Sequence, residues 1–183
     1  MDSLRTSDEG RHSEWQPPPQ GWISCTTDVA IGRSQSAGAA VIRDHNGTIL
    51  KILTFQTNHI EALPGETFAV CKGAETMVQL GYKNVVFQCD SSNVVAALNS
   101  KPTDVHTLHF NIQELAKIFF ALTGNLNLWE IQWIPRGCNG VAHAVARWAN
   151  RNNSFGLFDL PSFDDFLQQV NADGRVDSSL SLG

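Results

Sequence analysis

The feature that most constrains the fold is a short apolar run that ends in an aspartate and leads directly into a helix. Val85, Val86 and Phe87 predict a buried strand, and Asp90 and Ser91 come immediately after it. Open α/β sheets carry their functional side chains at the carboxyl ends of such strands. We therefore expect Asp90 at the functional edge of a sheet. Taken alone, an aspartate before a helix is more often a cap than a ligand, so the other acids of the chain have to be considered with it.

The segments before this run predict an antiparallel meander. Residues 22–30, 37–43 and 48–55 are rich in apolar and β-branched side chains. Asp44-His-Asn-Gly47 between the second and third segments has the Asn-Gly pair that is typical of a tight hairpin turn. Three strands joined by short turns follow from this pattern.

After residue 65 the pattern alternates between helix and strand. Helices are predicted over residues 66–80, 91–98, 105–123 and 139–150, and strands over residues 84–89 and 126–134. The order predicts a mixed α/β sheet of five strands, three antiparallel and two added by parallel crossovers, with helices on its faces. Trp129, Trp133 and Trp148 are expected in the core or against the sheet.

The folded domain is predicted to span residues 21–154. Residues 1–20 are polar and end in a proline-rich stretch that predicts a disordered segment and an extended linker, and residues 155–183 read as an acidic tail. The net charge is −5, but the acids gather at the two ends and leave the domain almost neutral. Such a domain lacks the strong positive field of a dedicated nucleic-acid binder, although it can still bind phosphates locally.

Neither a secretory signal nor a run of about 20 apolar residues is present. The four cysteines contain no Cys-x-x-Cys pair, which argues against a zinc knuckle and a redox motif. We expect an intracellular protein, nuclear or cytoplasmic, that is not secreted, does not enter a membrane and is a monomer.

The order of the elements and of three acids resembles ribonuclease H type 1. Asp28 lies late in the first strand, Glu66 at the start of the first helix and Asp90 at the end of the fourth strand. More narrowly, the chain resembles the plant reverse-transcriptase-like ribonuclease H domains of non-LTR retrotransposons. The motifs that carry this resemblance are Trp15-x-Pro-Pro-x-x-Gly-Trp22, Cys25-Thr-Thr-Asp28, Gly38-x-x-Val-Ile-Arg-Asp-x-Asn-Gly47, Glu66-x-x-Ala69, Gly81-Tyr-x-Asn-Val-x-Phe87, Asp90-Ser-x-x-Val-Val95 and Pro135-Arg-x-x-Asn-x-x-Ala142.

The resemblance implies endonucleolytic cleavage of the RNA strand of RNA–DNA hybrids with two divalent metal ions. Asp28, Glu66 and Asp90 are then the ligands of Mg²⁺, with Mn²⁺ as a substitute. Hard carboxylate oxygens are the ligands that Mg²⁺ prefers. Three carboxylates at one place also repel one another unless cations lie between them. The acids are therefore predicted to be both metal-binding and catalytic.

The fourth catalytic position is His143, where the resemblance implies a carboxylate. At helical spacing it shares a face with Asn139 and Arg147. Imidazole is a poor ligand for Mg²⁺ but an acceptable one for Mn²⁺, so we expect weaker binding of the second metal. Two other interpretations stay open: a protonated imidazole that assists phosphate departure, and an exposed helix residue without a role.

Four further residues are candidates for nucleic-acid binding: Ser91, Asn93, Arg136 and Asn139. Helix capping is the competing interpretation for Ser91 and Asn93.

Some departures from the family point to a weaker enzyme. Val29 stands where the family often has glycine and is expected to crowd the RNA strand. The loop before the last helix is short, and only Lys101-Pro-Thr-Asp104 joins the helices where bacterial relatives carry a basic handle. The chain thus lacks both the longer loop before the last helix and the basic handle, and each loss should lower affinity for a hybrid. The alternative is therefore a catalytically impaired module that binds nucleic acid or protein without cleaving.

Overall fold

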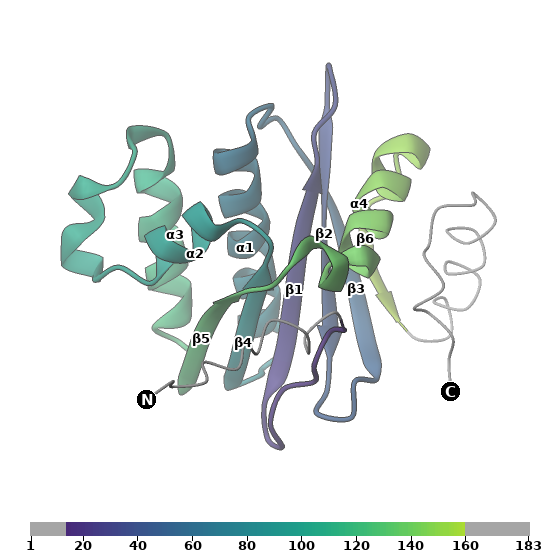
Figure 1. The fold of residues 1–183 in the computed structure, drawn as a ribbon, viewed down its shortest axis with the longest axis horizontal. Helices are drawn as coiled ribbons and strands as arrows, with labels where there is room; N and C mark the ends of the chain where they lie inside the picture. The colour runs from purple at the N-terminus through teal and green to yellow at the C-terminus, as the bar shows by residue number, and fades with distance from the viewer. Residues whose placement is uncertain (1–13, 160–183) are drawn as a thin grey trace, which may run out of the picture.

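The computed structural model describes residues 14–159, which form one mixed sheet with helices on both faces (Figure 1). The strands are β1 (Ile23–Ala30), β2 (Ser36–Arg43), β3 (Ile49–Thr57), β4 (Asn84–Cys89), β5 (Leu128–Trp133) and β6 (Gly156–Asp159). The α-helices are α1 (Ala62–Gln79), α2 (Ser92–Leu98), α3 (Gln113–Thr123) and α4 (Gly140–Asn152). Short 3₁₀ turns are η1 (Pro102–Thr107), η2 (Phe110–Ile112) and η3 (Arg136–Cys138). None of the helices within residues 14–159 has the length and apolar character that a membrane crossing requires.

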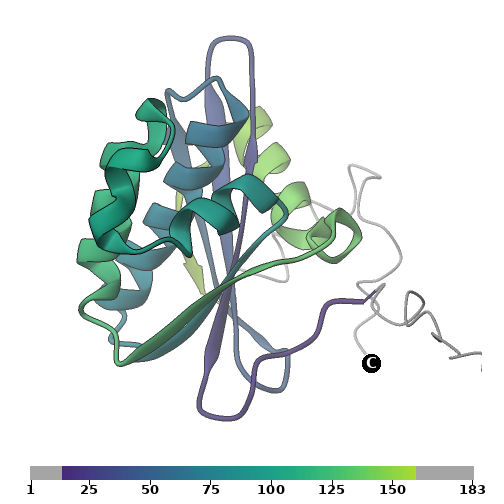
Figure 2. The ribbon, with the colours of Figure 1, turned by 60° about the vertical axis from the view of Figure 1, so that its left-hand side comes forward.

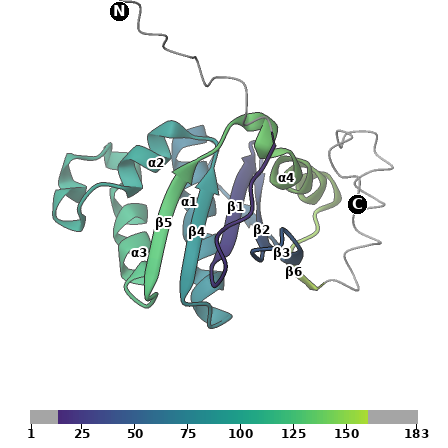
Figure 3. The same cartoon turned by 60° about the horizontal axis from the view of Figure 1, so that its bottom comes forward.

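The order of strands across the sheet is β5-β4-β1-β2-β3-β6 (Figure 3). β1, β2 and β3 form the antiparallel meander, whereas β4 is parallel to β1 and β5 is parallel to β4. The predicted mixed α/β class is therefore confirmed. Because β1 and β4 are parallel neighbours, their carboxyl ends lie at the same edge of the sheet, which places Asp28 beside Asp90.

The sheet has a sixth strand that the prediction of five missed. β6 pairs antiparallel with β3, and an ion pair joins Lys51 to Asp159 across the two strands. Residues 156–159 therefore belong to the sheet and not to the predicted tail. A strand of four residues is too short to show a clear alternation in sequence. Residues 160–183 of that tail lie outside the described residues.

Two predicted helices have different bounds. α1 begins at Ala62 and not at Glu66, because Pro64 is tolerated in the first turn, where its missing N–H would have no partner. The helix predicted over residues 105–123 is divided into η1, η2 and α3. At the break, the His109 ring accepts a hydrogen bond from the Asn111 N–H and caps a new turn. The apolar residues keep a helical spacing on both sides of this break, so the sequence pattern does not reveal it.

Helices cover the two faces of the sheet unequally (Figure 2). α1, α2 and α3 lie on one face, where Ala40 and Ile42 of β2 belong to the larger core. α4 lies on the other face, where Ala39 and Val41 of the same strand join its alanine-rich side. β2 is buried along its whole length because its neighbouring residues alternate between these two cores.

The described part of the predicted linker packs on the domain. The Trp15 indole N–H donates to Gln88 Oε1 at 2.8 Å, and its ring lies 4.2 Å from the guanidinium carbon of the buried Arg43. Pro18 is buried as well. Part of the segment predicted as an extended linker thus contacts the domain through Trp15, while residues 1–13 lie outside the described residues.

Trp15→Ala is expected to lower the free energy of unfolding by about 1–3 kcal/mol. The change removes a hydrogen bond and a cation–π contact, and it exposes the buried Arg43 guanidinium. Urea unfolding followed by far-UV circular dichroism measures the loss. Gln16→Ala, next to it and exposed, is the control and should change the stability little. Equal stability of the two variants would show that the segment does not support the fold.

Candidate metal centre

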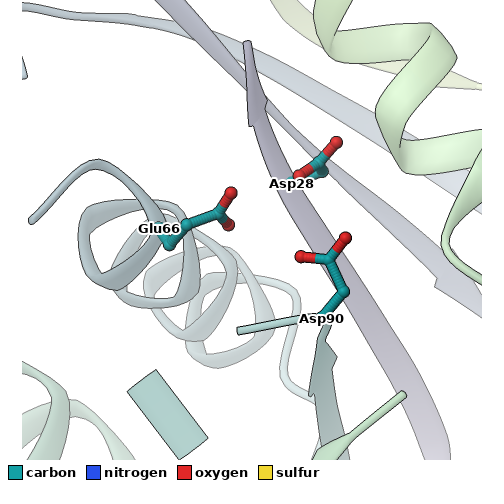
Figure 4. A group of neighbouring side chains, drawn as sticks. All are labelled: Asp28, Glu66 and Asp90. Carbon is teal, nitrogen blue, oxygen red and sulfur yellow. The ribbon is translucent and has the colours of Figure 1, made fainter. Parts of the chain in front are cut away.

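Three acidic side chains from distant parts of the sequence meet at the edge where β1 and β4 end. Asp28 comes from β1, Glu66 from the first part of α1, and Asp90 from the residue after β4. One carboxylate oxygen from each of them lies within 4.8 Å of the others, and the side chains point toward one another (Figure 4). The three acids that the sequence singled out are thus brought together.

Local packing brings α1 close enough to β1 for Glu66 to reach this edge. A Cβ atom on Gly65 would lie 3.1 Å from Ile31 Cδ1 and 3.5 Å from Val29 Cγ1, so glycine allows the close approach. Val29 is 7 % exposed and packs beneath this glycine. Its side chain faces α1. The expectation that Val29 crowds the RNA strand is therefore wrong.

Glu66 carries the strongest electrostatic perturbation of the cluster. Burial raises the pKa of Glu66 to about 9, and the neighbouring charge of Asp28, a hydrogen bond with it and the charge of Asp90 add to the rise. A backbone hydrogen bond from Val29 acts in the opposite direction. Glu66 Oε2 is buried without a hydrogen-bond partner among the described residues. At neutral pH the cluster therefore holds a proton that a bound cation would displace.

Asp90 lies at the more open side of the cluster. Burial raises the pKa of Asp90, and the charge of Asp28 raises it further, while Arg136, Asn139 and His143 oppose the rise. Arg136 Nε is 3.7 Å from Asp90 Oδ2, and 93 % of the Arg136 side chain is exposed. This contact is solvated, so it contributes little to stability and leaves the guanidinium available to a ligand.

His143 contacts the cluster from α4. Its Nδ1 lies 2.7 Å from Asp28 Oδ2, and 54 % of its side chain is exposed. The hydrogen bond with Asp28 raises the pKa of His143, and burial opposes the rise. His143 therefore reaches the site, as its helix face predicted, but in this structure it is a partner of Asp28 and lies outside the group of three clustered oxygens.

The four candidate nucleic-acid contacts fall into two kinds. Asn93 and Arg136 are exposed beside the cluster. The Ser91 hydroxyl accepts from the Val94 N–H as the N-cap of α2, which was the competing interpretation. Asn139 is 1 % exposed, and its amide donates to the Thr27 carbonyl at 3.1 Å. Its observed contact thus ties the start of α4 to β1 and presents almost no surface to a ligand.

Two residues near the site were missed by the sequence reasoning. Trp133, expected in the core or against the sheet, is 53 % exposed, and its indole N–H donates to the Asp90 carbonyl at 3.1 Å. Gln88 lies two residues before Asp90 and binds Trp15 and Thr26. Trp133 shares a face of the sheet with the buried Ile131, so alternation alone predicts burial; its exposure comes from its place at the end of β5, the edge strand, which carries no sequence signal.

The chemistry of the three donors fits a divalent cation. All three are hard oxygen ligands, they crowd closely enough to repel, and one buried oxygen of Glu66 has no partner among residues 14–159. A cation of the Mg²⁺ or Mn²⁺ class would relieve the repulsion and satisfy that oxygen. The arrangement can therefore bind a metal next to a solvated arginine that suits an anionic ligand.

Comparison with known families gives one match. The family described as reverse transcriptase-like matches residues 26–149, which include all three acids and His143. No curated protein sequence matches the chain.

The solved structures similar to this chain include several ribonucleases H. The ribonuclease H1 of Halobacterium salinarum shares 18 % identity with a TM-score of 0.63, over 72 % of this chain and 98 % of that one. The N-terminal ribonuclease H domain of a Mycobacterium tuberculosis protein shares 19 % identity with a TM-score of 0.60, over 70 % and 92 %. LC11 ribonuclease H1, solved with an RNA/DNA hybrid, shares 18 % with a TM-score of 0.56, over 72 % and 99 %. At these identities the likeness shows a ribonuclease H-like fold.

Proposed function

The chain belongs to the reverse transcriptase-like family, and we propose on this basis that it is a metal-dependent endonuclease that hydrolyses the RNA strand of RNA–DNA hybrids. One observation carries the proposal: Asp28, Glu66 and Asp90 converge at the strand ends, with ligand atoms within 4.8 Å of one another. A cluster of this kind costs stability in the metal-free protein, since burial and mutual repulsion raise the pKa of Glu66 to about 9. A bound cation would offset this cost, whereas the fold itself gains no stability from the three acids.

Asp28, Glu66 and Asp90 would hold Mg²⁺, or Mn²⁺ in its place. When bound, such an ion supplies a nucleophilic water at neutral pH and stabilises negative charge on the phosphate oxygens. The protein contributes the geometry of the three carboxylates and the proton that Glu66 releases on binding. Arg136 adds a solvated guanidinium beside Asp90, which attracts the phosphate of the substrate.

His143 is proposed as the fourth member of the site. Its ring nitrogen shares a proton with Asp28 Oδ2 and thereby orients that carboxylate. Since half of its side chain is exposed, the imidazole can also hold a proton close to the phosphate group. Both roles act on a substrate already held by the three acids.

The proposed partner is an RNA–DNA hybrid, the ligand present in the LC11 ribonuclease H1 structure. Asn93 and Arg136 are the exposed side chains that we place against its backbone. We further propose that the protein acts as a monomer in the nucleus or cytoplasm and derives from a plant retrotransposon of the non-LTR type. The motif order in the sequence supports this origin.

A second candidate function is a module that binds nucleic acid or protein without cleaving. The contact between His143 and Asp28 favours it, because the hydrogen bond occupies one of the two carboxylate oxygens of Asp28. The absence of a fourth carboxylate at that position also weakens a second metal site.

A cleavage assay separates the two candidates. An RNA–DNA hybrid labelled on the RNA strand is incubated with the full chain and Mg²⁺, Mn²⁺ or EDTA. We expect internal cuts in the RNA strand with either metal, faster with Mn²⁺, and none in EDTA. Asp90→Asn serves as the inactive control, and circular dichroism confirms that it is folded. Hybrid binding without cleavage in both metals would establish the non-cleaving module instead.

A further inference from the structure

α4 and the strands beneath it are almost free of acidic residues, although the whole chain carries a net charge of −5. The sequences of β2, β3 and α4 contain no aspartate or glutamate, and β1 contains only Asp28 of the metal centre. Asp159 of β6, at the edge of this region, is paired with Lys51. A polyanion that approaches the protein therefore meets less repulsion over α4 than over the rest of this acidic chain.

Two arginines form a row on the exposed side of α4. Arg147 and Arg151 follow His143 at intervals of four residues, so the three side chains lie on one face of the helix, and all three are exposed. The row begins at the metal centre, where His143 Nδ1 is 2.7 Å from Asp28 Oδ2, and each step along it rises by about 6 Å. Neither arginine forms an ion pair with another residue of the range 14–159.

A third arginine lies in the loop between β1 and β2, which packs against the end of α4 (Figure 1). Gln35 Nε2 of this loop donates to Asn153 Oδ1 at 3.1 Å. A Cβ atom on Gly32 would lie 3.1 Å from Asn150 Nδ2, so the loop and the helix approach closely. Arg33 is exposed in the loop and has no ion pair within the described part of the chain. We define the α4 basic surface as Arg33, Arg147 and Arg151.

Solvation of a helix surface is the competing explanation for these arginines. The other long helices show what that arrangement looks like, because Lys72 pairs with Glu75 on α1 and Lys117 pairs with Glu114 on α3. Solvating surfaces mix the two signs of charge in this way. The helix dipole favours a cation in the last turn of α4, but it does not account for cations in the middle of the helix and in a separate loop. Unpaired guanidinium groups are the side chains best suited to phosphate.

We infer that the α4 basic surface binds the sugar-phosphate backbone of one strand of the nucleic acid, where that strand continues beyond the metal centre. The inference rests on the proposed function for the identity of this ligand. Contacts of this kind do not read bases, so the binding is independent of sequence and weakens with salt. Arg147 and Arg151 lie one and two helical turns beyond His143, so the phosphates that they hold are not those at the three carboxylates and need no metal.

The experiment measures binding of the full chain to a labelled RNA–DNA hybrid in EDTA, by fluorescence anisotropy over a series of salt concentrations. We expect the Kd to rise with salt and to be the same for hybrids of different sequence. Arg147→Ala and Arg151→Ala should each weaken binding about threefold to tenfold at low salt and reduce the slope of log Kd against log salt concentration by about one. Arg147→Lys keeps the charge and should retain most of the affinity and of the slope.

Lys117→Ala is the matched control, because it removes an exposed helical cation from α3, on the other face of the sheet. It should leave the affinity and the slope as they are in the unchanged protein. Unchanged slopes in both arginine-to-alanine variants would overturn the inference, and a lower melting temperature in those variants would then assign the arginines to the fold. Displacement of the hybrid by polyglutamate at equal concentration of charge would overturn it in favour of an acidic protein partner.

Cleavage with Mg²⁺ or Mn²⁺ tests the proposed function separately. Binding with the expected slopes, but without cleavage in either metal, would support the α4 basic surface and contradict the nuclease. Cleavage by the unchanged protein together with unaltered slopes in the arginine variants would have the opposite meaning.

Discussion

Glu66→Gln is expected to abolish Mg²⁺-dependent cleavage and at the same time to raise the melting temperature of the metal-free protein. The loss of activity follows from removal of one of three metal ligands and should be about a hundredfold or more. The gain in stability arises because burial and the charges of Asp28 and Asp90 force Glu66 to take up a proton on folding, whereas the neutral amide needs none. We expect an increase of about 3–6 °C at pH 8.

The gain should depend on pH in a defined direction. The pKa of Glu66 rises from its ordinary 4.5 to about 9 in the folded protein, so the folded state binds the proton more tightly than the unfolded chain. The resulting stabilisation is fully present below pH 4.5 and is lost progressively as the pH rises to about 9. Glutamine does not titrate, so the advantage of Glu66→Gln should grow across this window. Mg²⁺ should raise the melting temperature of the unchanged protein most at the alkaline end.

Thermal unfolding at pH 5, 7 and 9, with and without 10–20 equivalents of metal, measures these effects. Glu75→Gln removes an acid from the same helix α1 outside the cluster and is the matched control. It should keep the cleavage activity of the unchanged protein and the same rise in melting temperature with Mg²⁺. A Glu66→Gln protein that is less stable than the unchanged one at pH 9 would contradict the picture of a strained cluster.

The fold could be predicted in most of its parts because its elements have clear periods. The meander, the two parallel strands and α4 follow from apolar patterns that local structure obeys. β6 could not be found in this way, since four residues carry no usable period and its pairing with β3 depends on tertiary contacts. The contacts of Trp15 with Gln88 and Arg43 are likewise long-range, so a proline-rich stretch looked like a linker.

The site could be predicted where topology alone brings residues together. Parallel pairing of β1 and β4 puts Asp28 beside Asp90, and this placement does not depend on how the neighbouring side chains pack. The roles of Val29 and Asn139 depended instead on which way each side chain faces after packing. Val29 is buried beneath Gly65, and Asn139 binds the Thr27 carbonyl, and neither contact has a sequence signal.

His143→Asp is expected to raise affinity for Mg²⁺ and Mg²⁺-dependent cleavage by about tenfold. The substitution exchanges an imidazole, which shares a proton with Asp28, for a fourth carboxylate close to the other three. The same change should lower the melting temperature of the metal-free protein, because it adds to the repulsion that already raises the pKa of Glu66 and Asp90. Saturating Mg²⁺ should restore the lost stability. Isothermal titration with Mg²⁺ gives the affinity, and initial cleavage rates give the activity.

The pH dependence and a neutral variant separate ligation from simple removal of the histidine. The hydrogen bond with Asp28 raises the pKa of His143, so the imidazolium persists to a higher pH and opposes cation binding below that pKa. His143→Asn removes this charge without supplying a carboxylate, and we expect it to improve Mg²⁺ binding at pH 6 but not at pH 8.5. His143→Asp should improve binding at both. Equal behaviour of the two variants would show that His143 acts only through its charge and its contact with Asp28, and the fourth-ligand position would then have no part in metal binding.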